Sequence, residues 1–109
     1  MVARVTEVRV RPEDVEEATR LFDESVVPAA REEEGFIGGL LLAREDGHAF
    51  VIDICDTLEN MRANERNGFY QAQVKKFADK IVGHPHREFF DVKVAKRLRG
   101  APELLEEVD

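Results

Sequence analysis

The chain has 109 residues, 43% of them hydrophobic and 36% charged, and its 23 acidic and 16 basic side chains give a formal net charge of −7. This length suits a single domain, and the composition is typical of a globular protein rather than a disordered one. The negative charge argues against nucleic-acid binding, because it repels phosphate backbones. No apolar stretch approaches the roughly 20 residues that cross a membrane. Cys55 is the only cysteine, which excludes an internal disulfide and favours a reducing, cytoplasmic location.

The first third of the chain predicts a strand followed by a helix. Residues 2–10 alternate between side-chain types in the manner of a strand. Pro12 and the acidic residues after it favour a helix start, and apolar residues then recur every three or four positions as far as Ala29. Pro28 lacks the backbone N–H that a helix needs and should kink it, and Gly35 is placed to end it.

The middle of the chain predicts a β-hairpin. Residues 36–44 and 49–55 are two largely apolar segments with the composition of strands. The Asp46-Gly47 pair between them is a strong signal for a tight turn. We therefore expect these two strands to pair antiparallel.

A second helix and a last strand complete the pattern. Asp56 or Thr57 is placed to cap the helix, because both side chains accept hydrogen bonds from free backbone N–H groups. The helix is expected to run to about Val82, with Asn67-Gly68 as a weak point within it. Residues 87–96 then alternate as the last strand.

The predicted order is β-α-β-β-α-β, which is the arrangement of a ferredoxin-like domain. We expect an α+β fold in which a four-stranded antiparallel sheet carries both helices on one face. Residues 1–97 would form this domain. Residues 98–109 would form an acidic C-terminal tail, with at most one helical turn at 102–105.

Alternation along the strands assigns each side chain to one face of the sheet, and two helices cover only one face. The face expected under the helices is apolar: Val8, Val10, Phe50, Ile52, Ile54, Phe90, Val92 and Val94. The other face mixes apolar and charged side chains: Val5, Glu7, Arg9, Val51, Asp53, Cys55, Phe89, Asp91 and Lys93. A homodimer through this second face would bury its apolar groups and pair its acids with its bases. The alternative is a monomer with scattered surface hydrophobes.

Two segments carry a resemblance to a known family. Val27-Pro28-Ala29-Ala30-Arg31 leads into Gly35-Phe36-Ile37-Gly38, and Asp56-Thr57-Leu58-Glu59-Asn60-Met61-Arg62 opens the second helix. With the spacing over residues 2–97, these segments resemble the antibiotic biosynthesis monooxygenase domain of the dimeric α/β-barrel superfamily. That family includes quinol monooxygenases and haem-degrading enzymes. The resemblance implies a ferredoxin-like subunit, a dimeric α/β barrel, and oxygenation of a small aromatic or quinone-like compound.

Several positions depart from the family's pattern. Cys55 stands where the family often has a tryptophan, and Asn64 and Phe69 stand where the quinol-monooxygenase branch has histidines. The haem-degrading branch needs an asparagine, a tryptophan and a haem-ligating histidine, whose matching positions are Thr6 or Glu7, Asn64 and Val74. Valine does not ligate iron, so haem degradation of that type is not expected.

Oxygenation without a cofactor needs a dry pocket, a substrate bound as its anion, and a base. Asn64 is a candidate to orient a substrate hydroxyl, Tyr70 to donate a hydrogen bond, and His86 to act as the base. The alternatives are an exposed helical asparagine and a tyrosine that only packs. Cys55 is either a redox-active thiol, activated by the helix that follows it, or a small residue that enlarges the pocket. The candidate pocket residues are Asn64, Tyr70, Thr6, His86, Cys55 and Phe69, and we expect no metal and no cofactor.

Three functions remain open from the sequence. The first is a cofactor-independent monooxygenase that acts on a small aromatic or quinone-like compound. The second is a non-catalytic dimer of the same fold that binds a small ligand or acts under stress, and the third is an isomerase or lyase of the superfamily. Oxygen uptake during turnover would identify the first function, and a pocket filled by side chains would favour the second.

Overall fold

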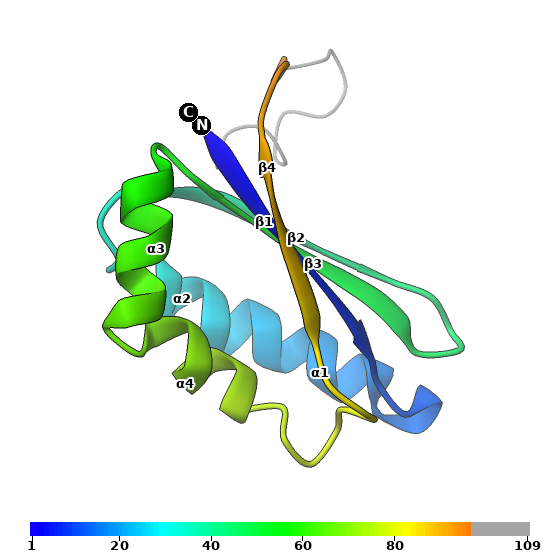
Figure 1. Cartoon of the computed structure of the whole chain (residues 1–109). Coiled ribbons are helices and arrows are strands. Elements are labelled where there is room, and N and C mark those ends of the chain that lie inside the picture. Colours follow the sequence, from blue (N-terminus) through cyan, green and yellow to red (C-terminus); the bar gives the residue numbers. More distant parts are fainter. Residues whose placement is uncertain (97–109) are drawn as a thin grey trace.

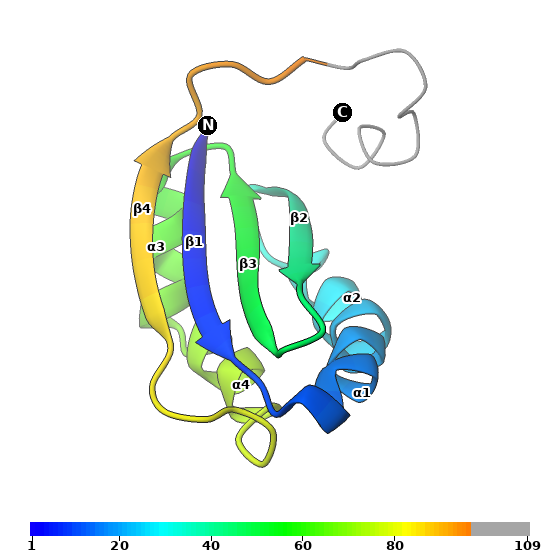
Figure 2. The same cartoon turned by 90° about the vertical axis from the view of Figure 1, so that its right-hand side faces the viewer.

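A computed structural model describes residues 1–96. They form a four-stranded antiparallel sheet in the order β2-β3-β1-β4, with β1 at Val2–Arg9, β2 at Phe36–Ala43, β3 at His48–Cys55 and β4 at His86–Asp91. All helices of the described residues lie on one face of this sheet (Figures 1 and 2). The predicted order of elements and the ferredoxin-like α+β arrangement are confirmed.

The first helical segment changes its winding as it approaches Pro28. It consists of η1 (Pro12–Asp14), α1 (Val15–Leu21), the π-helical η2 (Phe22–Val26) and α2 (Val27–Ala30). At the end of η2 the N–H of Val27 donates to the carbonyl of Phe22, five residues earlier. Pro28 has no N–H to donate to the preceding turn, so the irregularity expected there takes the form of a π-helical segment.

The hairpin between β2 and β3 forms as predicted. The N–H of Gly47 donates to the carbonyl of Arg44, and the N–H of Arg44 donates to the carbonyl of His48. Gly47 has a φ of +93°, and a Cβ at this position would collide with the carbonyl oxygen of Val10. Both the turn and the close approach of the two chain segments therefore require glycine.

The second helical segment is two helices, and it ends earlier than predicted. Thr57 caps α3 (Leu58–Arg66) by accepting a 3.0 Å hydrogen bond from the N–H of Asn60. Gly68, with a φ of +87°, then breaks the helix before α4 (Phe69–Lys75). The prediction of one helix to about Val82 was wrong, because the chain after Lys75 turns to pair with the end of β1, where Ile81 forms a bridge with Val10.

The last strand is also shorter than predicted. β4 ends at Asp91, where it lies opposite Val2, and the N–H of Val92 donates to the carbonyl of Met1. The expected continuation to residue 96 was wrong, because residues 92–96 belong to no strand. The helical turn expected at 102–105 lies outside the described residues.

In β3 and β4, the side chains that face the helices are those predicted for the other face of the sheet. Cross-strand partners share a face, and Arg4 of β1 lies opposite both Asp53 and Phe89. Val51, Asp53 and Cys55 therefore face the helices, whereas Phe50, Ile52, Ile54 and Phe90 do not. The assignment of Val8 and Val10 to the helix-covered face was right. The error arose because Asp53 was expected on the outer face as a charge, but it pairs with Arg4 beneath the helices.

The face of the sheet without helices is rich in large apolar side chains. We call it the helix-free face, and its apolar members are Val5, Leu40, Leu42, Phe50, Ile52, Ile54 and Phe90. Leu42 is 48% exposed and Phe90 50% exposed. Within residues 1–96, no helix has the length and apolar character needed to cross a membrane.

Candidate functional site

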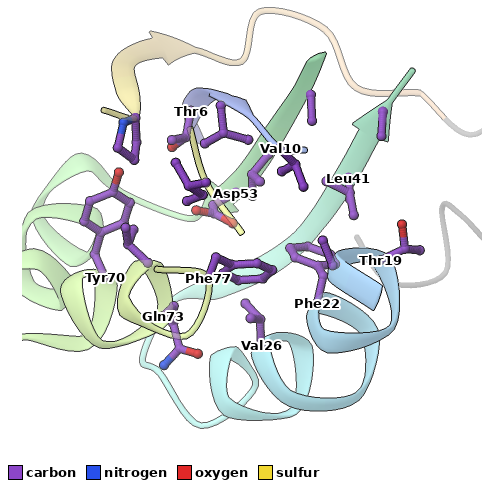
Figure 3. Close-up of a pocket in the computed structure, with 18 of the residues that line it drawn as sticks. Thr6, Val10, Thr19, Phe22, Val26, Leu41, Asp53, Tyr70, Gln73 and Phe77 are labelled. Atoms are coloured by element: carbon purple, nitrogen blue, oxygen red, sulfur yellow. The ribbon is translucent and has the colours of Figure 1, made fainter. Parts of the chain in front are cut away.

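A cavity lies between the sheet and the helices, and we call it the central cavity (Figure 3). Its volume is about 80 Å³. Most of its walls are aliphatic or aromatic, and they come from β1, β2, β3, the first helical segment, α4 and the residues that follow β1 and α4: among them Val8, Val10, Phe22, Val26, Leu41, Val51, Phe69, Val74 and Phe77. The few polar groups in such a space fix how a ligand lies within it.

A buried ion pair forms part of the cavity wall. Arg4, which is 1% exposed, donates to Asp53 Oδ2 from Nε at 3.1 Å and from Nη2 at 2.8 Å. Both bonds end on the same oxygen, and Oδ1 accepts neither. Burial raises the pKa of the Asp53 carboxyl above its ordinary value of 3.8, because it disfavours the charged form more than the nearby Arg4 charge restores it. Asp53 is thus a carboxylate that accepts a proton more readily than an exposed one.

The ion pair belongs to a larger network of charges. Arg4 Nη1 also donates to Asn64 Oδ1 at 2.9 Å and to Glu65 Oε2 at 3.2 Å, both from α3. Arg87 of β4 holds the same carboxylate with bonds of 2.9 Å and 3.0 Å. Burial alone would raise the pKa of Glu65, but the hydrogen bonds from Arg87 and Arg4 outweigh it and lower that pKa. Two guanidinium groups and two carboxylates therefore balance one another beside the cavity.

Tyr70 lies against both of these guanidinium groups. The Cζ atom of Arg4 is 4.3 Å from the centre of the Tyr70 ring, and the Cζ atom of Arg87 is 5.1 Å from it. Contacts of this length are cation–π interactions, which favour one ring orientation. Figure 3 shows the side chains of Thr6, Asp53, Tyr70 and Phe77 converging on the central cavity.

Two further polar groups at the cavity are buried without a partner. Thr6 is 3% exposed, and its hydroxyl has no hydrogen-bond partner among the described residues. The Oε1 atom of Gln73 is likewise buried and has no hydrogen-bond partner among the described residues. Leaving such groups unpaired costs free energy, so each one in a folded protein calls for a reason. A ligand in the central cavity that reaches the Thr6 hydroxyl would supply its missing partner, whereas the Gln73 amide points away from the space beside Asp53 (Figure 3).

The structure divides the six candidate pocket residues into three groups. Thr6, Phe69 and Tyr70 line the central cavity. Asn64 and Cys55 are buried nearby, with Asn64 Nδ2 at 3.8 Å from Cys55 Sγ, but neither lines the cavity. His86 lies on β4 with its side chain 70% exposed, 3.1 Å from the Glu88 carboxylate.

Cys55 does not have the activated thiol that its position before a helix suggested. Its side chain packs fully buried against Val2 and Met61. Burial raises the pKa of the thiol from 9.0 to about 11, although the Arg4 charge opposes this shift. Of the two interpretations of Cys55, the activated thiol does not fit, because the loss of hydration outweighs the attraction of the Arg4 charge.

Sequence reasoning missed Arg4, Asp53 and Glu65 as members of the site. Asp53 was expected to pair with bases on the outer face of a dimer. The sequence did contain a signal, because Arg4 has the same parity along its strand as Val2, Val8 and Val10. A charge on an apolar face needs an opposite charge beside it, and Asp53 is the acid at the matching register position.

The cavity does not provide for a bound iron or another metal ion. The described residues that line it include no histidine, cysteine or methionine. Val74, which stands at the position of the haem-ligating histidine in the haem-degrading branch, is one of the lining residues. Within residues 1–96, no group of three or more histidine, cysteine, aspartate or glutamate side chains is arranged to hold a metal ion. The residues present thus do not fit haem ligation of the proximal-histidine kind.

A ferredoxin-like α+β domain with a polar-edged apolar cavity under its sheet is the class of protein that this fold and site define. Residues 1–54 match the family model described as antibiotic biosynthesis monooxygenase. The chain belongs to the antibiotic biosynthesis monooxygenase family. Comparison with curated proteins gives no match.

Solved structures share the fold at low sequence identity. A Nitrosomonas europaea protein of unknown function, NE2512, is 23% identical with a TM-score of 0.68, and the match covers 91% of this chain and 95% of that one. A candidate antibiotic biosynthesis monooxygenase from Caulobacter crescentus is 18% identical with a TM-score of 0.67, over 84% and 88% of the two chains. A MhuD variant with two manganese protoporphyrin IX molecules per active site is 19% identical with a TM-score of 0.70, over 89% and 99%.

Proposed function

We propose that this protein is a cofactor-independent monooxygenase that oxygenates a small hydroxylated aromatic compound of the quinol type in the central cavity. The observation that carries the proposal is the Asp53 carboxylate, which is buried in the wall of an apolar cavity and held by Arg4. A carboxylate in this setting is a suitable general base, because burial raises the pKa of Asp53 toward the working pH.

Removal of one proton activates such a substrate. Asp53 accepts the proton of a ring hydroxyl, and the negative charge moves from the carboxylate to the substrate oxygen. Arg4 attracts the charge in either place, so the transfer does not leave an isolated anion in an apolar space. In this proposal the substrate contacts the Thr6 hydroxyl, which has no other partner, and the Tyr70 ring, which Arg4 orients.

The electron-rich anion then reacts with oxygen. One atom of O2 forms a bond to a ring carbon, and the O–O bond breaks as the second oxygen leaves. That second oxygen takes two hydrogens from the substrate and departs as water, with Asp53 returning the proton that it accepted. A quinol and O2 thus give a hydroxyquinone and water, and the four electrons that reduce O2 come from the substrate.

Oxygen uptake with 1,4-dihydroxynaphthalene tests the proposal. The wild-type protein should consume oxygen above the uncatalysed rate, and Asp53→Asn should lower this enzymatic rate by about 10² or more, as expected for loss of a general base. Asp91→Asn changes an exposed carboxylate and should retain the activity. In the wild type, the rate should fall at low pH as Asp53 becomes protonated, at a pH above 3.8.

The same measurement separates the rival functions. A protein that binds the aromatic compound but consumes no oxygen would be the non-catalytic dimer of the same fold. A protein that changes the compound without oxygen uptake would be an isomerase or lyase. The full wild-type rate in a folded Asp53→Asn variant would contradict the role of Asp53.

We also propose that two copies associate through the helix-free face. Leu42 and Phe90 on this face are about half exposed, although contiguous apolar surface is usually covered in a folded protein. A second copy related by a two-fold axis would cover them with the same patch. An interface of about 1,600 Å² is the usual size for a stable pair, and the four-stranded face offers apolar side chains from all of its strands.

A further inference from the structure

A second cavity adjoins the central cavity at the edge of the sheet. It lies between the η2–α2 segment and the first half of β2, the edge strand, and its volume is about 260 Å³. We call it the edge cleft. Apolar side chains such as Val27 and Ile37 line it, together with the exposed charged residues Asp23 and Arg31.

The two cavities share a wall that includes Asp53. Five residues line both of them: Phe22, Val26, Ala30, Phe36 and Asp53. Asp53 is the only charged member of this shared wall. A ligand group held at the Asp53 carboxylate therefore has space on two sides, one in the central cavity and one in the edge cleft.

Because Gly39 has no side chain, it leaves space between the Asp53 carboxylate and the edge cleft. It is the cross-strand partner of Asp53 on β2 and lines the cleft. A Cβ at Gly39 would lie 3.9 Å from Asp53 Oδ1, 3.9 Å from Phe22 Cζ and 3.3 Å from the carbonyl oxygen of Ile52. One carbon would fit there with a small adjustment, whereas a branched side chain would fill the space between Asp53 and Phe22.

The π-helical segment η2 contributes to the wall that the two cavities share. Phe22 and Val26, its first and last residues, are both buried and both line the two cavities. Short π-helical segments are rare and occur frequently at functional sites. The irregular winding before Pro28 thus coincides with the place where the two cavities meet.

We propose that the edge cleft is a second subsite, which holds the apolar substituent of a hydroxyaryl ligand whose hydroxyl lies at Asp53. The inference rests on the proposed function, because it takes Asp53 as the group that meets the hydroxyl. The substituent has to be adjacent to the hydroxyl on the ring, because the edge cleft borders the Asp53 carboxylate itself. Gly39 then determines which ligands bind.

Binding of phenol, 2-phenylphenol and 4-phenylphenol, measured by calorimetry or NMR titration, tests this subsite without requiring turnover. The wild-type protein should bind 2-phenylphenol about tenfold more tightly than phenol, because the second ring is buried in the edge cleft. It should also prefer 2-phenylphenol to 4-phenylphenol, whose second ring would point away from the edge cleft. Gly39→Val should remove the advantage of 2-phenylphenol and leave phenol binding within about twofold.

Two further variants distinguish a selective loss of 2-phenylphenol binding from a general loss caused by misfolding. Gly39→Ala should lower the affinity for 2-phenylphenol by a smaller factor, since it adds a single carbon. Leu58→Val changes an exposed leucine at the start of α3 and should leave all three affinities unchanged.

Three results would overturn the subsite: no advantage of 2-phenylphenol in the wild type, no selective effect of either Gly39 variant, or an equal loss of phenol and 2-phenylphenol binding. The proposed function fails separately, if the selective binding is found but no variant or wild-type protein consumes oxygen.

Discussion

The two faces of the sheet differ in where their charged and apolar side chains lie, and the difference is the reverse of what is usually expected. The helix-covered face carries Arg4 and Asp53 in the interior, whereas the helix-free face presents Phe50 and Ile52 without a covering layer. Charge on a strand is therefore no guide to the solvent side when an opposite charge stands on the neighbouring strand. The two proposals assign separate roles to these faces, the proposed chemistry to the covered face and the proposed association to the other.

A buried ion pair is not by itself a source of stability. Taking two charges out of water costs free energy that their attraction only partly returns, and well-packed apolar residues often serve equally well. The presence of Arg4 and Asp53 beside an apolar cavity is better explained by the proposed chemistry of a buried carboxylate than by stability.

The largest expected effect comes from breaking the charge network on the covered face. Arg4→Met removes the partner of Asp53 and one partner of Glu65, and it should lower the free energy of unfolding by about 3–5 kcal/mol. Urea denaturation at a fixed protein concentration measures the change. Arg62→Met on α3 alters an exposed arginine outside the network and should change that free energy by about 0.5 kcal/mol or less. Equal effects of the two substitutions would contradict the burial of the network.

A substitution on the helix-free face should act on assembly. Ile52→Lys places a charge in the centre of the proposed interface and should weaken dimerisation by about 2 kcal/mol or more, the loss typical of a central interface residue. Sedimentation velocity at micromolar concentration would show the wild type as a dimer and this variant as a monomer. Ala72→Lys, on the exposed side of α4, should remain dimeric. A monomeric wild type would remove the case for the dimer.

Cys55 gives a smaller and pH-dependent effect. Its thiol has a pKa of 9.0 when hydrated and about 11 in the fold, so the unfolded state loses this proton first as the pH rises. The stability from the buried thiol is complete below pH 9 and is lost progressively as the pH approaches about 11. Between pH 8 and pH 10 the wild type should lose about 1 kcal/mol more than Cys55→Ala. Parallel pH dependences in the two proteins would show that the thiol titrates as if hydrated.

An effect of similar size to that of Cys55 is expected at the break between α3 and α4. Gly68 has a φ of +87°, and a Cβ added there would have no atom within 4 Å, so an extra methyl group meets backbone strain and no collision. Gly68→Ala should cost about 1 kcal/mol. Thermal unfolding would measure it, and an unchanged or raised stability would indicate that one continuous helix is equally favourable.

The order of elements could be predicted because its signals are local. The Asp46-Gly47 turn, the Thr57 cap and the alternation of residues 2–10 each act within a few residues. The end of the second helical segment could not be found in this way. The chain leaves the helix to pair with β1, and Ile81 meets Val10 only in the folded protein.

The candidate site was less predictable for a similar reason. Thr6, Phe69 and Tyr70 line the central cavity, and each follows from the resemblance or from a residue type. Asp53 could not be placed, because β3 has apolar residues at both parities and its facing depends on one long-range pair. Only the register of Arg4 with Asp53 decides which side of β3 is covered.

The proposed chemistry depends on Asp53 being a buried carboxylate whose affinity for a proton is raised by its surroundings. A titration of the Asp53 carboxyl carbon by 13C NMR, with the resonance assigned from the Asp53→Asn variant, tests it most directly. We expect a pKa above 3.8 in the wild-type protein. A pKa at or below 3.8 would mean that Asp53 is hydrated or that Arg4 outweighs its burial, and would contradict its proposed role as the base.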